Sequence, residues 1–218
     1  MIFSRTEQVL REKTRTLSDA HGVQADYFCG DIASESDLGG LVQKCKDLGG
    51  VDIIILNTPR PPSPMRDFLD ESDNARWEQA YEQQLKGALL ALRKTAPMLV
   101  GRGWGRIVAI TSASIKQPMP RHAISTIFRA GVQAALKHLS MELAEHHITV
   151  NAVAPATVET PTFAKFHNYE QRVNAVPLKR AGKPEELAAT VAFLASNHAG
   201  FITGESIQLD GGQTRALC

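Results

Sequence analysis

The stretch HAISTIFRAG, residues 122–131, holds three side chains suited to chemistry just ahead of a strongly patterned helix. Arg129 carries a fixed positive charge and only donates hydrogen bonds, so it could bind a carboxylate, a ribose oxygen or a developing oxyanion. Ser125 is a far weaker acid than a tyrosine, whereas His122 has a pKa suited to proton transfer. Two interpretations stay open. One is a functional site; the other is a helix N-cap at Ser125, a solvent-facing Arg129 and a surface His122.

Short apolar runs alternate with helical patterns along the whole chain. The apolar runs predict strands at residues 2–4, 25–32, 51–57, 105–112, 148–155 and 205–212, and the helical patterns lie between them. The run at 51–57 is apolar on both faces, as expected for a central parallel strand. This alternation predicts an α/β fold of the Rossmann type, a doubly wound parallel sheet with helices on both faces, formed as one domain of residues 1–218.

Ligands of such sheets bind beyond the carboxyl ends of the strands. The loops after Ser4, Asp31, Asn57, Ser112 and Pro155 are therefore expected to face one crevice. The proline-rich run PRPPSP, residues 59–64, is expected to form a rigid wall over that crevice rather than a ligand for another protein.

Composition argues against several classes of partner. The 24 Lys and Arg residues nearly balance the 23 Asp and Glu residues and are spread along the chain, so we expect no nucleic-acid or membrane partner. Three cysteines without a pairing pattern, and a start without a secretory signal, predict a cytoplasmic protein. His138, Glu142 and His146 are spaced four residues apart on a helix, but a solvated face explains them better than a metal site, and we expect no metal.

Five segments together resemble one family. RIVAITSAS resembles the catalytic-serine strand of the short-chain dehydrogenases/reductases, and NAVAPATVETP resembles their asparagine-x-valine-x-proline-glycine segment. Residues 178–212 resemble the C-terminal helix and last strand of that family. GDIAS and VDIIILNTP resemble its adenine-contacting aspartate turn and its Asn-Asn-Ala-Gly strand. The resemblance covers nearly the full length of the chain.

The chain departs from the family pattern at the catalytic positions. The resemblance places Ser125 and Arg129 where the family has its Tyr-x-x-x-Lys pair, and Gln84 where it has its active-site asparagine. Ser112 alone is unchanged among the four positions. The family moves a hydride between a nicotinamide and a carbonyl carbon while the tyrosine transfers the proton, so the resemblance implies a catalytic group that lacks an acidic phenol. His122 and Tyr169 are other conceivable proton donors.

A second departure lies at the front of the chain. The sequence opens inside what matches the family's second strand, so the first strand, Gly-rich turn and helix, about thirty residues, have no counterpart. The resemblance therefore implies an N-terminally truncated Rossmann sheet in which the first two strands lack the neighbour that joins them to the rest. An upstream start codon and a truncated or diverged gene copy are both open explanations.

The resemblance also implies a cofactor site. Arg5 follows the second strand, where NADP-preferring members place a basic residue for the 2′-phosphate, and Asp31 matches the adenine-contacting aspartate. The remaining matched positions are Asn57, Pro155, Val158 and Thr160. NADP is the expected cofactor; NAD, or no nucleotide if the truncation is real, are the alternatives.

Three functions compete at this stage. The first is NADP(H)-linked carbonyl or alcohol redox on a small molecule with an altered catalytic group. The second is a non-redox lyase like the halohydrin dehalogenases, which also carry an arginine in the site. The third is a catalytically inactive homologue that acts as an oligomer partner. For an active enzyme we expect a homodimer or homotetramer, with residues 163–176 as a lid over the substrate.

Overall fold

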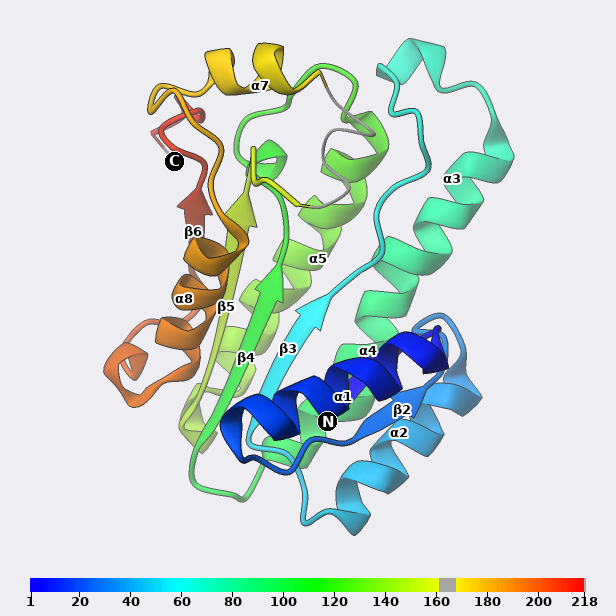
Figure 1. Ribbon diagram of the computed structural model, residues 1–218, viewed down its shortest axis with the longest axis vertical. Helices are drawn as coiled ribbons and strands as arrows, with labels where there is room; N and C mark the ends of the chain where they lie inside the picture. The colour runs from blue at the N-terminus through cyan, green and yellow to red at the C-terminus, as the bar shows by residue number, and fades with distance from the viewer. Residues whose placement is uncertain (161–167, 218) are drawn as a thin grey trace.

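The structure is a computed structural model that describes residues 1–160 and 168–217. It is an α/β fold in which parallel strands are flanked by helices (Figure 1). In the described part of the chain, no helix is both long and apolar enough to cross a membrane.

The larger sheet has four parallel strands. These are β3 (Ile53–Asn57), β4 (Gly105–Ile110), β5 (Ile148–Pro155) and β6 (Ser206–Leu209), hydrogen-bonded in that order. The four runs were predicted as strands, and β4 and β5 are buried along almost their whole length because helices cover both faces. All four carboxyl ends meet at one edge of this sheet, which lies at the top in Figure 1.

Alternate side chains of the central strands pack on opposite faces of the sheet. Ile107 and Ala109 belong to the larger core, formed with α4 (Gly87–Thr95) and α5 (Ala123–Glu142). Val108 and Val153 belong to a second core, formed with α8 (Pro184–Ala195). The twofold alternation of the strands therefore builds the three-layer arrangement predicted from the sequence.

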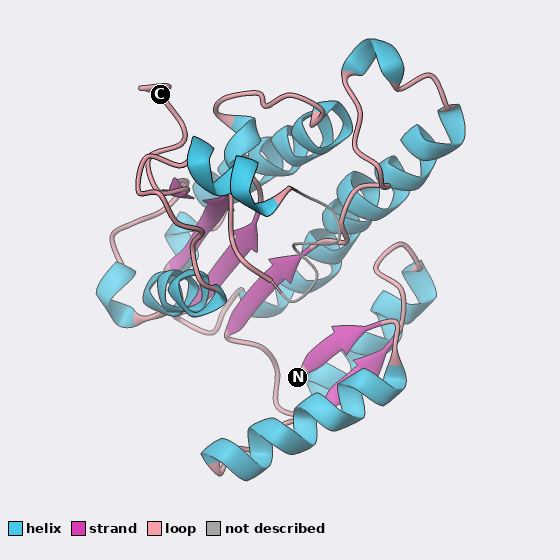
Figure 2. Ribbon diagram, turned by 45° about the horizontal axis from the view of Figure 1, so that its top comes forward, coloured by secondary structure: helices cyan, strands magenta, loops and turns pink. Residues whose placement is uncertain are grey.

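The N-terminal unit forms a separate two-stranded sheet. Strands β1 (Ile2–Ser4) and β2 (Tyr27–Cys29) pair in parallel and are linked by α1 (Glu7–His21). Helix α2 (Glu35–Asp47) follows, and its N-cap Ser34 accepts a hydrogen bond from the Asp37 backbone N–H. Helix α2 packs on α4, so this unit shares the larger core although its strands do not join the larger sheet (Figure 2).

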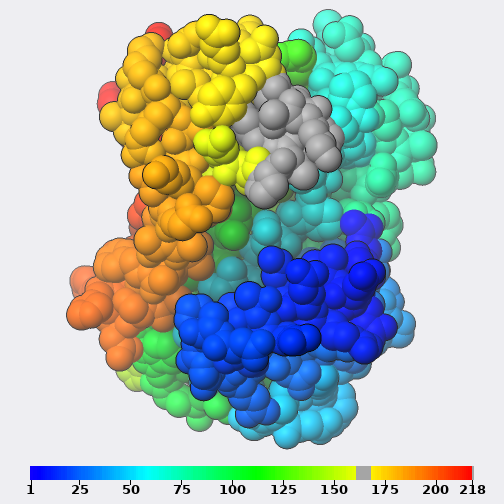
Figure 3. Space-filling view, viewed as in Figure 1, coloured from blue at the N-terminus to red at the C-terminus, as the bar shows by residue number. Residues whose placement is uncertain are grey.

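The break between β1 and β3 agrees with the expected missing neighbour strand. Among the described residues, β3 pairs only with β4, and β1 pairs only with β2. Ile53 and Ile55 are 44% and 45% exposed and line an apolar groove with Leu187 and Val191 of α8. Figure 3 shows this region as a hollow between α8 and the N-terminal unit. The prediction that residues 51–57 are buried on both faces was therefore wrong.

Residues 74–99 form four successive helical segments. Helix α3 (Asn74–Ala80) leads into a π-helix, η2 (Tyr81–Lys86), which leads into α4 and the short η3 (Ala96–Leu99). A π-helical turn inside an α-helix is rare and is often found at functional sites. Two side chains of η2 contact α5, since Leu85 lies against Gly131 and Tyr81 against Phe128.

Short elements complete the edge at which the carboxyl ends meet. They are η1 (Phe68–Asp70), η4 (Ala113–Ile115) and α7 (Tyr169–Ala175). Two further short helices, η5 (Ala144–His146) and η6 (Asn197–Ala199), lie at the opposite end of the sheet. The predicted lid, residues 163–176, falls partly on residues 161–167, which lie outside the described part of the chain. Its described part forms α7, which lies above the carboxyl ends of the sheet (Figure 1).

Asn151 provides a test of how the last strand is joined to the sheet. Its buried amide donates to the Ile202 carbonyl at 2.7 Å and accepts from the Glu205 N–H at 3.1 Å. Asn151→Ala leaves both backbone groups without these partners, so we expect the free energy of unfolding to fall by about 2 kcal/mol in urea denaturation. Asn197→Ala, at an exposed asparagine, should leave it within about 0.5 kcal/mol of the parent. Equal losses in the two variants would contradict this role.

Candidate functional site

Arg129 and Ser112 meet at the carboxyl end of β4. The Arg129 guanidinium donates from one nitrogen to the carbonyl oxygens of Ile110 and Thr111, at 2.9 and 3.0 Å. Ser112 is the next residue, so α5 is joined to the site strand by this arginine. Arg129 is only 9% exposed, and the interpretation of it as a solvent-facing cation was wrong.

The Ser112 hydroxyl is held by a second serine. It lies 3.0 Å from the Ser114 hydroxyl and accepts a hydrogen bond from the Ser114 N–H at 3.2 Å. This contact makes Ser112 the N-cap of η4 and fixes the orientation of its side chain. Because Ser112 is half-buried and ends a strand, its hydroxyl is positioned to donate a hydrogen bond to a ligand oxygen.

Ser125 lies inside the first turn of α5. The N-cap of that helix is His122, so the interpretation of Ser125 as the N-cap was wrong. Ser125 is 5% exposed and borders a narrow closed space shared with Pro61, Pro62 and Glu71. The proline-rich loop thus covers the serine that replaces the family's tyrosine.

Gln84 lies in the π-helix η2 and is fully buried. Neither its amide nitrogen nor its amide oxygen has a hydrogen-bond partner among the described residues. A buried amide normally satisfies both groups, because leaving either without a partner costs about 1–3 kcal/mol.

The residues expected to hold a nucleotide lie on two separate parts of the fold. Arg5 follows β1, its side chain is 55% exposed, and it lies 3.9 Å from the Asp31 carboxylate. Arg5 also donates to the Gln83 side chain at 3.4 Å, which links the N-terminal unit to the π-helix beside Gln84. Asn57 is exposed at the carboxyl end of β3. These three side chains therefore lie around the break between β1 and β3.

The matched positions after β5 are only partly organised by hydrogen bonds. Pro155 is the last residue of the strand, and Val158 forms a parallel bridge with Gly182. Thr160 is exposed and is the last described residue before the gap at 161–167. Pro155 and Val158 therefore lie at the carboxyl edge of the sheet, and Thr160 lies beside the residues outside the described part of the chain.

A large cavity lies beside the start of α5. It has a volume of about 700 Å³ and lies between the proline-rich loop, the chain from Gln117 to His122, and α7. Its lining includes Arg60, Arg121 and Arg172. The cavity size suits a small organic ligand. These three arginines were not predicted from the sequence, although Arg60 and Arg121 lie in loops that were predicted to converge and Arg172 lies in the predicted lid.

His122 connects α5 to this cavity. Its Nδ1 lies 2.7 Å from the Pro120 carbonyl oxygen, which only accepts, so we assign the proton to Nδ1. Its Nε2 then accepts from the Arg172 guanidinium at 3.3 Å. Burial lowers the pKa of His122, and Arg172 and Arg121 lower it further. A neutral histidine bonded to an arginine is a poor proton donor, and His122 is half-buried rather than at the surface.

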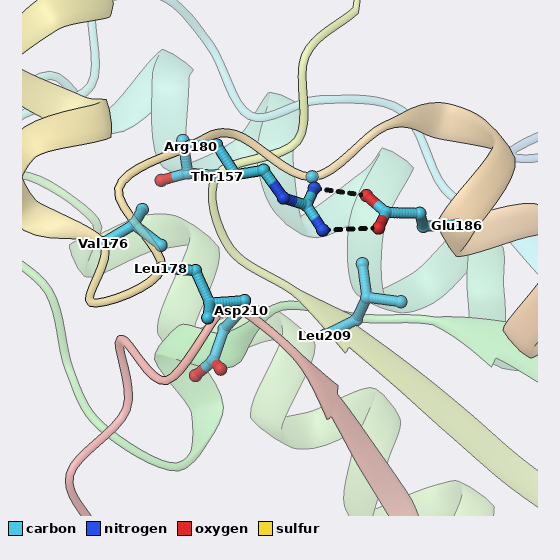
Figure 4. Close-up of a pocket in the computed structure, with 9 residues that line it drawn as sticks. Thr157, Val176, Leu178, Arg180, Glu186, Leu209 and Asp210 are labelled. Atoms are coloured by element: carbon cyan, nitrogen blue, oxygen red, sulfur yellow. Dashed lines mark hydrogen bonds and ion pairs between the residues drawn. The ribbon is translucent and has the colours of Figure 1, made fainter.

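A smaller cavity, of about 90 Å³, lies between α8 and the end of β6 (Figure 4). Two of its charged groups pair with each other, since Arg180 makes two hydrogen bonds to Glu186 at 2.7 and 2.8 Å. These bonds help lower the pKa of Glu186 to about 2. We assign this cavity a structural role at the start of α8. In the described part of the chain, no three His, Cys, Asp or Glu side chains gather closely enough to bind a metal.

The fold and the position of the site are those of a Rossmann-like α/β protein. The sequence profile of a family described as enoyl-(acyl carrier protein) reductase matches residues 1–214. A short-chain type dehydrogenase/reductase from Picea abies is 31% identical over 199 residues, which are 90% of this chain and 73% of the relative. The chain therefore belongs to the short-chain dehydrogenase/reductase family.

Two solved structures are closely similar. YwfH, an NADPH-dependent reductase involved in bacilysin biosynthesis, is 27% identical with a TM-score of 0.91, covering 99% of this chain and 88% of that one. The L-sorbose reductase of Gluconobacter frateurii, solved with NADPH and L-sorbose, is 25% identical with a TM-score of 0.89, covering 99% and 86%. The likeness extends over the whole chain, including the two sheets that the break separates.

The low pKa of His122 predicts a pH dependence of stability. Between the unfolded pKa, about 6.5, and the lower folded value, the unfolded chain binds a proton that the folded chain does not. Stability therefore falls as pH drops through this window. In urea denaturation at about pH 7.5 and about pH 5.5, His122→Gln should lose less stability on acidification than the parent. Asp67, Arg121 and Arg172 face this ring and are unchanged in the variant.

The matched control for that prediction is His198→Gln, at an exposed histidine. It should keep the pH dependence of the parent. If His122→Gln and the parent lose equal stability on acidification, the histidine is not held neutral by its surroundings.

Proposed function

We propose that this protein is an NADP(H)-linked oxidoreductase that interconverts a carbonyl and an alcohol on a small molecule, with an altered catalytic group. The observation that carries the proposal is that Arg129 of α5 binds the two backbone carbonyl oxygens that precede Ser112 at the carboxyl end of β4, near a cavity of about 700 Å³ that reaches the start of α5. The NADPH-dependent reductases among its structural relatives support the choice of cofactor.

The residues present fit the adenosine end of such a cofactor. Arg5 is more than half exposed at the carboxyl end of β1, where its guanidinium is available to a 2′-phosphate. Asp31 offers a carboxylate beside it, and the exposed Asn57 offers an amide to a ribose. In the described part of the chain, no Gly-rich turn fills the gap in the sheet that separates β1 from β3. We therefore assign no residue to the pyrophosphate.

Ser112 is the residue we assign to the substrate oxygen. The bound nicotinamide would supply or accept the hydride. Ser114 holds the Ser112 hydroxyl in place, so Ser112 can donate a hydrogen bond to the carbonyl oxygen without a further change of rotamer. Arg129 acts as a positioning residue, because its guanidinium donates hydrogen bonds to backbone carbonyl oxygens at the end of β4 rather than into the cavity.

Position 125 carries no phenol that could donate the proton required at the carbonyl oxygen. A serine hydroxyl and a guanidinium are both very weak acids, and His122 is held neutral by its contacts. We therefore propose that solvent supplies the proton in the direction of reduction and that a Tyr-Lys relay plays no part. Such a reaction should be slower than one with a positioned acid, which typically contributes about 10²–10⁴-fold.

NADPH binding tests the cofactor assignment. The parent protein should bind NADPH in a titration followed by nicotinamide fluorescence. Arg5→Ala removes a charge-assisted contact to the 2′-phosphate, so its Kd for NADPH should rise about tenfold while its Kd for NADH hardly changes. Arg11→Ala, at an exposed arginine of α1 that bonds Glu7, is the matched control and should leave both values unchanged. A parent protein that binds neither nucleotide would refute the proposed function.

Restoring the family pair tests the altered catalytic group. Ser125→Tyr combined with Arg129→Lys supplies a phenol whose pKa the lysine lowers, so turnover of a simple ketone with NADPH should rise by at least about tenfold. Arg129→Lys alone is the control, since it supplies the lysine without the phenol. A folded double variant that binds NADPH without a gain in turnover would argue against the placement of Ser125 and Arg129.

A further inference from the structure

Three arginines come to the large cavity from three different parts of the chain. Arg60 belongs to the proline-rich loop after β3, Arg121 to the turn before α5, and Arg172 to α7. A single arginine on a cavity wall is common, but three from separate elements require the fold to gather like charges in one place. Among the described residues that line the cavity, none is acidic.

The rest of the lining is neutral and falls into two kinds. Apolar contacts come from Met65, Met119 and several prolines, while Gln117, Gln171 and Gln213 offer uncharged polar groups. The cavity thus combines an apolar wall with a concentration of positive charge. A wall of this kind suits a ligand with an apolar body and one anionic group.

Arg121 is held in an unfavourable backbone conformation. Its φ of 59° lies in the left-handed region, which residues other than glycine rarely adopt and which costs about 1–2 kcal/mol. Its backbone N–H donates to the Asp67 carboxylate at 2.6 Å. Asp67 therefore helps fix the backbone that carries Arg121 to the cavity rather than lining the cavity itself. Strained residues that are stabilised by their surroundings often mark ligand sites.

The positive charges influence one another. Burial lowers the pKa of Arg172, and the nearby Arg121 and Arg60 lower it further. Burial also lowers the pKa of Arg129 to about 10, with a smaller contribution from Arg60. Like charges that lie close together repel one another, and a bound anion offsets this repulsion.

The cavity also adjoins the proposed catalytic group. Its wall from Gln117 to His122 is the chain that connects η4, which follows Ser112, with α5, which carries Ser125. Arg121, His122, Pro61 and Met65 line both this cavity and the narrow space beside Ser125. A ligand in the cavity therefore lies near Ser125, and the chain from Gln117 to His122 connects the cavity wall with the segment that follows Ser112.

We propose that the substrate is an anionic carbonyl compound, an oxo acid with an apolar body, whose charged group binds among Arg60, Arg121 and Arg172. This inference rests on the proposed function for the carbonyl, but the anion site itself can be tested without the cofactor. The planar carboxylate and the tetrahedral phosphate share the chemistry that these guanidinium groups recognise.

Binding of three probes to the parent protein distinguishes the possibilities. The probes are 2-oxo-4-phenylbutanoate, its neutral ethyl ester, and phenyl phosphate, measured by isothermal titration calorimetry without nucleotide. We expect the carboxylate to bind at least about tenfold more tightly than the ester, and its Kd to rise with added NaCl. Tighter binding of phenyl phosphate than of the carboxylate would assign the anion as a phosphate. Equal affinity for the acid and its ester would overturn the proposal.

Single substitutions locate the anion. Arg60→Gln, Arg121→Gln and Arg172→Gln should each raise the Kd for the preferred anion about tenfold and leave the Kd for the ester unchanged. Arg93→Gln, at an exposed arginine of α4, is the matched control. If none of the three cavity variants differs from Arg93→Gln, the anion binds elsewhere and the proposal is wrong. Circular dichroism and the NADPH titration verify that each variant is folded.

The two proposals fail in different ways. If the anion binds but NADPH does not, the cavity is an anion site and the redox function is refuted. If NADPH binds but no anion is preferred over the ester, the redox function stands and the substrate class is refuted. If both bind, the NADPH-dependent turnover of 2-oxo-4-phenylbutanoate should exceed that of its ester, and Arg121→Gln should raise KM more than it lowers kcat.

Discussion

The site depends on the parallel hydrogen bonding of β3 to β6. Parallel pairing brings every carboxyl end to one edge, so the loops after β3, β4 and β5 meet although they are far apart in the sequence. Arg129 strengthens this arrangement by binding two carbonyl oxygens at the end of β4. Ser112, the proline-rich loop and the chain before α5 all take their positions from that edge, and so does the large cavity.

The break between β1 and β3 shows how tertiary packing can hold a divided sheet. The N-terminal unit stays in place through α2, which packs on α4, and through polar contacts such as Lys94 with Glu35 at 2.7 Å. This packing gives the strand edges that face the break no further strand to pair with among the described residues. Ile53 and Ile55 remain partly exposed there. Unpaired edges and apolar surface of this kind favour association with another segment of chain.

The fold was largely predictable from the sequence, whereas the site was predictable only in part. The apolar runs located all six described strands, because short runs of apolar and β-branched residues between helical patterns favour strands whether or not both faces are buried. The resemblance located Ser112, Ser125, Arg129 and Gln84, but not what surrounds them. Burial of Arg129 and the closed space around Ser125 arise from the proline-rich loop and β4, which approach α5 only in the folded chain. No local pattern contains that information.

The sequence by itself determined the alternation of strands and helices and the family, because these follow from residue type and order. Only the tertiary structure decided that HAISTIFRAG contributes a buried arginine, a serine inside a helix and a neutral histidine bonded to Arg172. It also decided that Arg60, Arg121 and Arg172 line one cavity. Charges more than fifty residues apart interact only when the fold brings them within Coulombic range, and sequence order does not specify that distance.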